Sequence, residues 1–253
     1  MEQQHSRKQF LRNMIVGATS LPLILQACSK ESLTEDAAVA GDGGIGNSNA
    51  AAAPTVCRVT PPEMDGPFPL YNSRGSALVR TNINDGKTGV PLNIDFTVAN
   101  VNTGCTPIPN ARVDIWQCDK DGYYSGYIND GYLGRQNNIG RVFGRGIQYA
   151  NSAGLVHFES IYPGWYPGRI AHIHVQIFIN NALRLTTQIA FPDQINYAVY
   201  RTPLYAAHGQ NSTVYNNQAD ALFADSIAFQ LGTVVSNPQT GGYTLSHTIK
   251  ISA

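Results

Sequence analysis

The chain is poor in charge, and hydrophobic runs of membrane-spanning length do not occur in it. Only 13% of its 253 residues are charged, and 17 Lys and Arg residues balance 17 Asp and Glu residues. No basic stripe or Lys/Arg cluster occurs in the body of the sequence, so we expect no nucleic-acid partner. No stretch approaches the roughly 18 apolar residues that a membrane-spanning helix requires.

Helical patterns are also scarce, whereas Gly, Pro and Tyr are plentiful, at 24, 14 and 13 residues. Alternation of apolar and polar residues with a period of two is typical of half-buried strands. This alternation recurs over residues 92–101, 112–118, 155–159, 170–179, 183–190 and 243–251. Only residues 218–230 show helical spacing. We therefore predict an all-β fold, an antiparallel β-sandwich with long decorated loops and little helix, over residues 56–253.

The first 27 residues resemble an export signal. Basic residues precede an apolar run over residues 14–25, which is too short to cross a bilayer. Leu25-Gln26-Ala27-Cys28 then resembles a lipobox, whose cysteine is lipidated and becomes the mature N-terminus. Arg7-Lys8 resembles the pair of a twin-arginine signal, with an ordinary Sec signal as the alternative. Residues 28–55 lack apolar periodicity, which indicates a flexible tether. We expect an exported protein anchored by lipid at Cys28 to a bacterial membrane, in the periplasm or at the cell surface.

Three cysteines remain once Cys28 is assigned to the lipid. A disulfide is expected outside the cytoplasm, and three cysteines leave one thiol unpaired. Cys57 with Cys105 is favoured because both flank strands in turn-rich places. The sequence does not exclude a bond between Cys105 and Cys118.

The chemistry-bearing residues gather in two blocks. Residues two apart in a strand project to the same face, so His172 and His174 form a natural metal chelate. Alone, such a pair is more often part of a polar outer face. Tyr166 follows a Pro-Gly turn six residues before His172, and Tyr124 follows the Asp121-Gly122 turn of the second block. These tyrosines beside the histidines favour a metal centre.

Both blocks resemble those of the intradiol ring-cleavage dioxygenases, the catechol and protocatechuate dioxygenase family. The Ala-x-Val-Asp-x-Trp strand of that family matches residues 111–116, and its Gly-x-Tyr turn matches Gly122-Tyr123-Tyr124. The resemblance extends over residues 57–191. It implies a non-haem enzyme whose Fe(III) is held by Tyr124, Tyr166, His172 and His174.

The resemblance also implies a reaction. A catechol-type substrate and O2 would give a muconate-type diacid by cleavage between the two hydroxylated carbons. Tyr166 would leave the iron and take a substrate proton. Arg169 would stabilise negative charge that develops on the substrate, and Gln188 would orient that charge and the oxygen by hydrogen bonding. Two phenolate ligands favour ferric over ferrous iron because they are hard anionic donors.

Two other readings use the same residues. The His pair and one tyrosine could hold zinc in a hydrolase, or the sandwich could be an extracytoplasmic binding lipoprotein without catalysis. Only Pro167 and Gly168 separate Tyr166 from Arg169. That loop is shorter than in catechol and protocatechuate enzymes, which predicts a more open pocket. The sequence identifies neither the particular catechol nor the oligomeric state.

Overall fold

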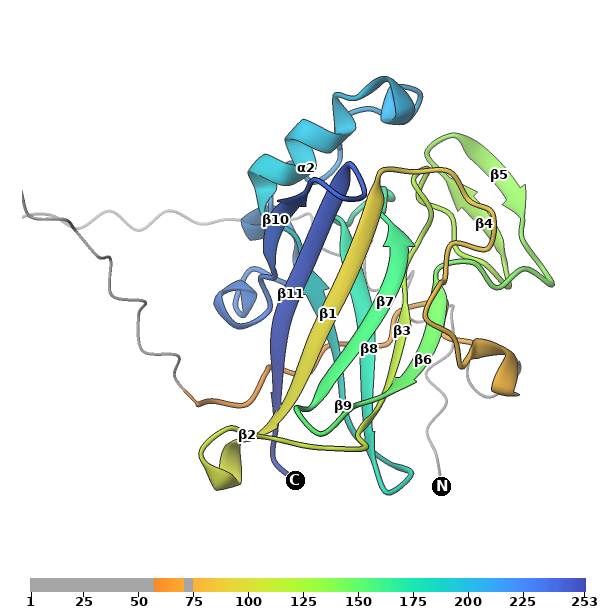
Figure 1. The fold of residues 1–253 in the computed structure, drawn as a ribbon. Helices are drawn as coiled ribbons and strands as arrows, with labels where there is room; N and C mark the ends of the chain where they lie inside the picture. The colour runs from red at the N-terminus through yellow and green to blue at the C-terminus, as the bar shows by residue number, and fades with distance from the viewer. Residues whose placement is uncertain (1–56, 71–74) are drawn as a thin grey trace, which may run out of the picture. The chain divides into compact units, whose positions relative to one another are not determined.

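Two β-sheets form the layers of the fold in residues 57–70 and 75–253, the residues that a computed structural model describes (Figure 1). Residues 57–253 make up one compact unit. The export signal predicted for residues 1–27 and the tether predicted for residues 28–55 lie outside the described residues. No helix among the described residues is long and apolar enough to cross a membrane.

The first sheet has β1 at its centre. Its five strands are β1 (Pro91–Asn100), β2 (Thr106–Pro107), β7 (Leu155–Ile161), β10 (Thr233–Asn237) and β11 (Gly242–Ile251). β1 runs parallel to β11 and antiparallel to β2 and β7. The antiparallel prediction is therefore wrong for the β1–β11 pair. The two strands come from opposite ends of the domain, so no hairpin sets their relative direction.

The second sheet carries the chemistry-bearing strands. It runs in the order β6 (Arg145–Tyr149), β3 (Arg112–Trp116), β8 (His172–Ile179) and β9 (Ala182–Ala190), and every pair is antiparallel. A separate hairpin, β4 (Ile128–Gly131) with β5 (Gly134–Asn137), lies at the end of the domain that also carries the helix (Figure 1).

The hydrophobic core consists of alternate residues from facing strands of the two sheets. Burial of such side chains is the main favourable contribution to folding. Because side chains alternate along a strand, burying one set of β8 residues turns the other set to the opposite face. The fully buried set comprises Ile94, Phe96 and Val98 of β1 and Ile173, Val175 and Ile177 of β8.

Helix is as scarce as predicted, but it lies elsewhere. The α-helix of the described residues is α2 (Asp193–Tyr200), which sequence spacing missed. Residues 218–230 form no α-helix, and η4 (Asn217–Ala219) and η5 (Ile227–Phe229) are single 3₁₀ turns. Asp220 is extended, with φ −78° and ψ 118°, which ends η4. Short 3₁₀ helices also occupy η1 (Gly75–Leu78), η2 (Val101–Thr103) and η3 (Pro203–Tyr205).

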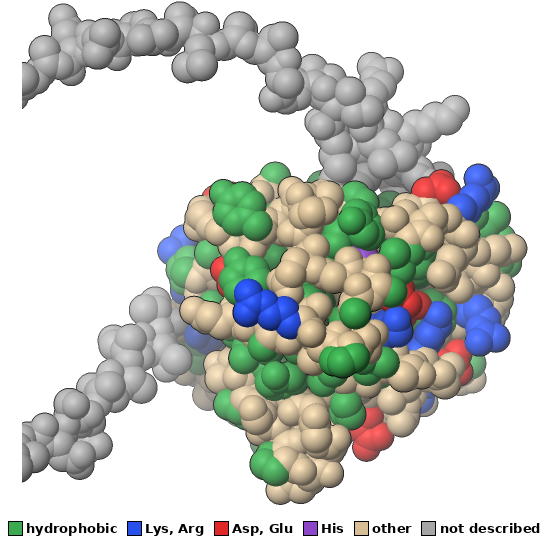
Figure 2. All heavy atoms as spheres, turned by 90° about the horizontal axis from the view of Figure 1, so that it is seen from above, with side chains coloured by type: hydrophobic (Ala, Val, Ile, Leu, Met, Phe, Trp, Pro, Cys, Tyr) green, Lys and Arg blue, Asp and Glu red, His purple; other side chains and the backbone are tan. Residues whose placement is uncertain are grey.

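The end of the domain with α2 and the β4–β5 hairpin shows a mixed surface. Hydrophobic side chains are scattered over it in separate patches, and the Lys and Arg side chains lie in small groups (Figure 2). Charge on this face is therefore dispersed.

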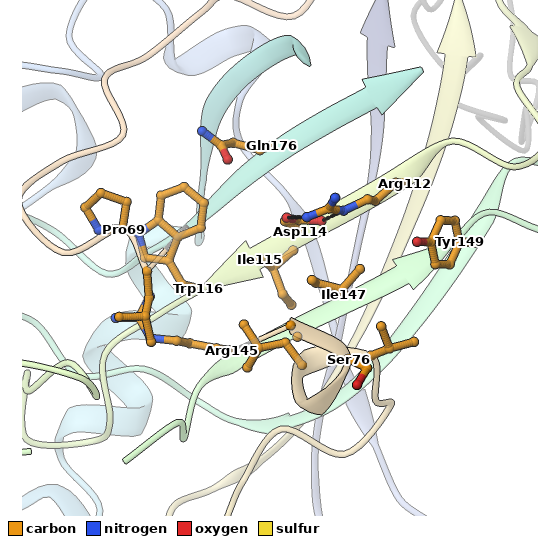
Figure 3. Close-up of a pocket in the computed structure, with 15 residues that line it drawn as sticks. Pro69, Ser76, Arg112, Asp114, Ile115, Trp116, Arg145, Ile147, Tyr149 and Gln176 are labelled. Carbon is orange, nitrogen blue, oxygen red and sulfur yellow. Dashed lines mark hydrogen bonds and ion pairs between the residues drawn. The ribbon is translucent and has the colours of Figure 1, made fainter. Parts of the chain in front are cut away.

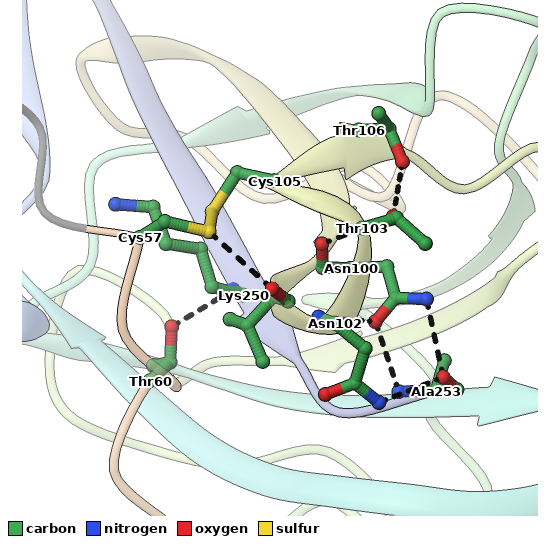
Figure 4. The surroundings of a disulfide bond; sticks show 10 residues. Cys57, Thr60, Asn100, Asn102, Thr103, Cys105, Thr106, Lys250 and Ala253 are labelled. Carbon is green, nitrogen blue, oxygen red and sulfur yellow. Dashed lines mark hydrogen bonds between the residues drawn. A yellow bond between two sulfur atoms is a disulfide. The ribbon is translucent and has the colours of Figure 1, made fainter.

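Cys57 and Cys105 form a disulfide, the pairing that the sequence favoured (Figure 4). It joins the start of the described domain to the loop between β1 and β2. Asn100 at the end of β1 and Asn102 in the same loop both donate to the main-chain oxygen of Ala253. Cys118 is a buried free thiol, and burial raises its pKa well above the ordinary value.

We predict that replacing both bonded cysteines, as Cys57→Ser with Cys105→Ser, lowers the free energy of unfolding by about 3–4 kcal/mol. The reason is that a bond across 48 residues restricts the unfolded chain. Urea unfolding of both proteins measures the difference. Midpoints that coincide would show that the bond contributes nothing to stability.

Candidate metal centre

Strand register places four polar or aromatic side chains in one row across the outer face of the second sheet. Trp116 of β3 pairs with Arg145 of β6 on one side and with His174 of β8 on the other, and His174 pairs with Gln188 of β9. Directly opposed residues project to the same face. The Trp116 indole stacks on the His174 ring, with centroids 4.8 Å apart and planes 1° from parallel. The row fixes the position of His174.

The two histidines bring their Nε2 atoms within 3.1 Å of each other. Nδ1 of His172 lies 2.6 Å from the carbonyl oxygen of Ile170. Because a carbonyl only accepts, Nδ1 donates and Nε2 keeps its lone pair. Burial, and then the positive charge of Arg169, holds the pKa of both imidazoles well below the ordinary value. Both rings are therefore neutral at pH 7, the form that binds metals.

A tight turn positions Tyr124. The Asp119 carboxylate accepts from two backbone N–H groups of this turn. Gly122 has φ +82°, and a Cβ there would lie 2.1 Å from the carbonyl oxygen of Trp165, so only glycine fits. The Asn129 side chain then binds both the N–H and the carbonyl of Tyr124. The Tyr124 ring is fully buried.

A second turn positions Tyr166. The N–H of Arg169 donates to the carbonyl of Tyr166 at 3.0 Å, with Pro167 and Gly168 between them. Gly168 has φ +87°, and Pro followed by such a Gly is the signature of a type II turn. The Tyr166 hydroxyl lies 3.2 Å from Nε2 of His172. Tyr166 as a whole residue is only partly buried, unlike Tyr124 and the two histidines.

The four groups meet at Nε2 of His172. The Tyr124 hydroxyl lies 3.5 Å from it, the Tyr166 hydroxyl 3.2 Å and Nε2 of His174 3.1 Å. One lone pair accepts one hydrogen bond, so the arrangement suits a cation better than a hydrogen-bond network. The described residues contain no group of three or more His, Cys, Asp and Glu side chains that could hold a metal ion. A metal at this point would therefore need the tyrosine oxygens.

The two tyrosines of the site help to decide which metal ion it would hold. Burial raises the pKa of both phenols above the ordinary value, so neither ionises at neutral pH without a cation. Direct bonding to a trivalent ion can overcome that burial. Zinc sites use Cys, His and carboxylate ligands, which makes two phenol donors an unusual set for zinc. Two phenols and two neutral imidazoles fit ferric iron.

The predicted catalytic residues lie together beside the centre. Nη2 of Arg169 donates to Oε1 of Gln188 at 2.6 Å, and Nε2 of Gln188 donates to the carbonyl of Met64 at 2.8 Å. Nε of Arg169 binds the carboxylate of Asp220, which sequence reasoning missed. Asp220 lies 51 residues from Arg169 in a loop, so no spacing pattern connects them. Phe68, which stacks on Tyr124 at 4.8 Å, was missed as a site residue too.

A pocket of about 320 Å³ lies on the same outer face, next along the strands (Figure 3). Trp116 belongs to its wall as well as to the row beside His174. Asp114 and Gln176, the next cross-strand pair, also line the pocket, and Asp114 forms a bidentate ion pair with Arg112. The pocket therefore shares Trp116 with the row of side chains that holds His174.

Residues 67–231 match the model of the dioxygenase family Dioxygenase_C. That range is more than half of the chain, so the chain belongs to this family, as its motifs predicted. A curated hydroxyquinol 1,2-dioxygenase of Rhodococcus opacus is 30% identical over 122 residues. The match covers 41% of this chain and only 37% of that protein.

Solved structures agree with this assignment. An intradiol ring-cleavage dioxygenase from Tetranychus urticae superposes with a TM-score of 0.67 and 28% identity, covering 78% of this chain and 95% of that one. The dioxygenase domain of a dioxygenase carbohydrate-binding fusion from Streptomyces sp. SirexAA-E superposes with a TM-score of 0.54 and 26% identity. The match covers 78% of this chain and 99% of that one.

We predict that Tyr124→Phe protein reconstituted with ferric iron holds less than about a tenth of an equivalent, because the substitution removes one of the four donors that a metal at this point would bind. Metal analysis of the purified protein measures this. Tyr123→Phe is the matched control, because the neighbouring Tyr123 hydroxyl donates to the carbonyl of Gly134, away from the centre. Equal iron in the two variants would exclude Tyr124 as a ligand.

Proposed function

We propose that this protein is a non-haem Fe(III) dioxygenase that opens catechol-type rings between the two hydroxylated carbons. Both atoms of O2 enter the product, a muconate-type diacid. The observation that carries the proposal is the meeting of Tyr124, Tyr166, His172 and His174 at one point, in a chain of the dioxygenase family.

Iron held there would keep the phenols ionised and activate a bound catecholate toward O2. Tyr166 would be the donor that yields its place to an incoming catechol, since it is the one of the four residues that is not fully buried. Its freed phenolate would accept a proton from a substrate hydroxyl. Arg169 is buried and keeps its charge, so it can stabilise negative charge on the ring, and Gln188 holds its guanidinium in place.

Turnover of catechol under labelled oxygen tests the proposal. We expect a product heavier by two ¹⁸O atoms when the protein is incubated with catechol and ¹⁸O₂, measured by mass spectrometry. Hydroxyquinol serves as a second substrate, because a curated relative carries that name. A product with no label, or no consumption of either compound by iron-loaded protein, would contradict the dioxygenase proposal. Hydrolytic activity of the zinc-loaded protein would favour the alternative of a zinc hydrolase instead.

We further propose that the protein works outside the cytoplasm, anchored by a lipid at Cys28. The lipobox-like residues Leu25–Cys28 support this, and so does the Cys57–Cys105 disulfide, since such bonds persist mainly in oxidising compartments. Catechol and O2 are small molecules that can reach such a site directly.

We predict that Cys28→Ala moves the protein from the membrane fraction to the soluble fraction, because it removes the acceptor of the lipid. Fractionation and immunoblotting of cells that express each form measure this. Ser29→Ala is the control and leaves the acceptor intact. Equal membrane association of the Cys28→Ala form and the natural protein would exclude a lipid at this residue.

A further inference from the structure

Arg169 carries three guanidinium nitrogens, and two of them have protein partners. Nε lies 3.1 and 2.9 Å from the two carboxylate oxygens of Asp220. Nη2 donates to Gln188 at 2.6 Å. Nη1 has no partner among the described residues. Because the guanidinium is planar and rigid, fixing Nε and Nη2 also fixes the direction in which Nη1 points.

The Asp220 carboxylate binds Arg169 and two nearby backbone N–H groups. Its side chain is fully buried. Besides Nε of Arg169, its oxygens accept from the backbone N–H of Ile170 at 2.9 Å and of Leu222 at 3.0 Å. A buried carboxylate is costly unless it is paired and hydrogen-bonded, and here both oxygens are satisfied. The pair links the loop after η4 to the residues that lead into β8.

Arg169 lies beside the candidate centre. Gln188, which accepts from Nη2 of Arg169, is the cross-strand neighbour of His174. Preorganised charges are effective in catalysis because they need not reorient during the reaction.

We propose that Asp220 is a positioning residue for ring cleavage. It holds the Arg169 guanidinium so that Nη1 is the nitrogen left to bind substrate, and its negative charge balances the buried cation. This inference rests on the proposed function. It assigns a role to a residue outside the ligand set and outside the Arg169–Gln188 pair.

The variant Asp220→Asn separates positioning from folding. The amide oxygen can still accept from the backbone N–H of Ile170, but the charge and the two-oxygen contact with Nε are lost. Asp193→Asn is the matched control. Asp193 accepts from the backbone N–H of Asn217 at 2.9 Å, so it holds the same loop by one hydrogen bond and does not touch Arg169.

We expect Asp220→Asn in the full-length protein to lower kcat for catechol by about 10- to 100-fold, since misplacing a group by about 1 Å can cost that much. KM should change less than about threefold, because the interaction of Arg169 with the substrate strengthens mainly as negative charge develops in the transition state. Bound iron and the visible spectrum of the resting protein should match the natural protein. A crystal structure of the metal-free variant should show Arg169 no longer within hydrogen-bond distance of Gln188. Asp193→Asn should leave all four readouts unchanged.

A kcat within twofold of the natural protein, or an Arg169 that still binds Gln188 in the variant, would overturn the proposal. Loss of iron by Asp220→Asn would overturn it as well, because the residue would then serve the centre as a whole. If the natural protein fails to cleave catechol, the proposed function falls first. The conformation of Arg169 in the variant then decides alone whether Asp220 holds the guanidinium.

Discussion

The candidate site depends on four polar side chains that converge at one point and form few other hydrogen bonds. Two tyrosine hydroxyls and Nε2 of His174 surround the single lone pair of His172 Nε2 within 3.5 Å. Three of the four side chains are buried, and burial disfavours both charged histidines and charged tyrosines. Polar groups that are buried with too few partners are costly. A trivalent cation at this point would satisfy all four donors at once.

Much of the remaining architecture holds those donors in place. The alternation of β8 turns both histidines outward because Ile173 and its neighbours are needed in the core. Register with β3 brings the Trp116 ring flat against His174. The tyrosines come from turns, each of which needs a glycine with positive φ. A sheet thus supplies the two histidines of the site, and two turns supply the two tyrosines.

The four residues that converge at Nε2 of His172 could be named from the sequence, whereas the residues that support them could not. Local spacing identifies the His172–His174 pair, and the turn motifs together with the family resemblance pick out Tyr124 and Tyr166. Asp220 could not be found in this way, because its partner Arg169 lies far along the chain. The helical spacing of residues 218–230 was misleading for a related reason. The Asp220 carboxylate binds Arg169 and Ile170 outside that segment as well as Leu222 within it, and its backbone is extended where a helix would continue. The parallel β1–β11 pair likewise depends on tertiary assembly.

The visible absorption spectrum of the purified protein, recorded before and after catechol is added without oxygen, tests the central claim most directly. Tyrosinate bound to ferric iron predicts a red-brown protein whose charge-transfer band shifts when catechol binds. A protein that stays colourless after reconstitution with ferric iron would contradict the assignment of these four residues as an iron centre.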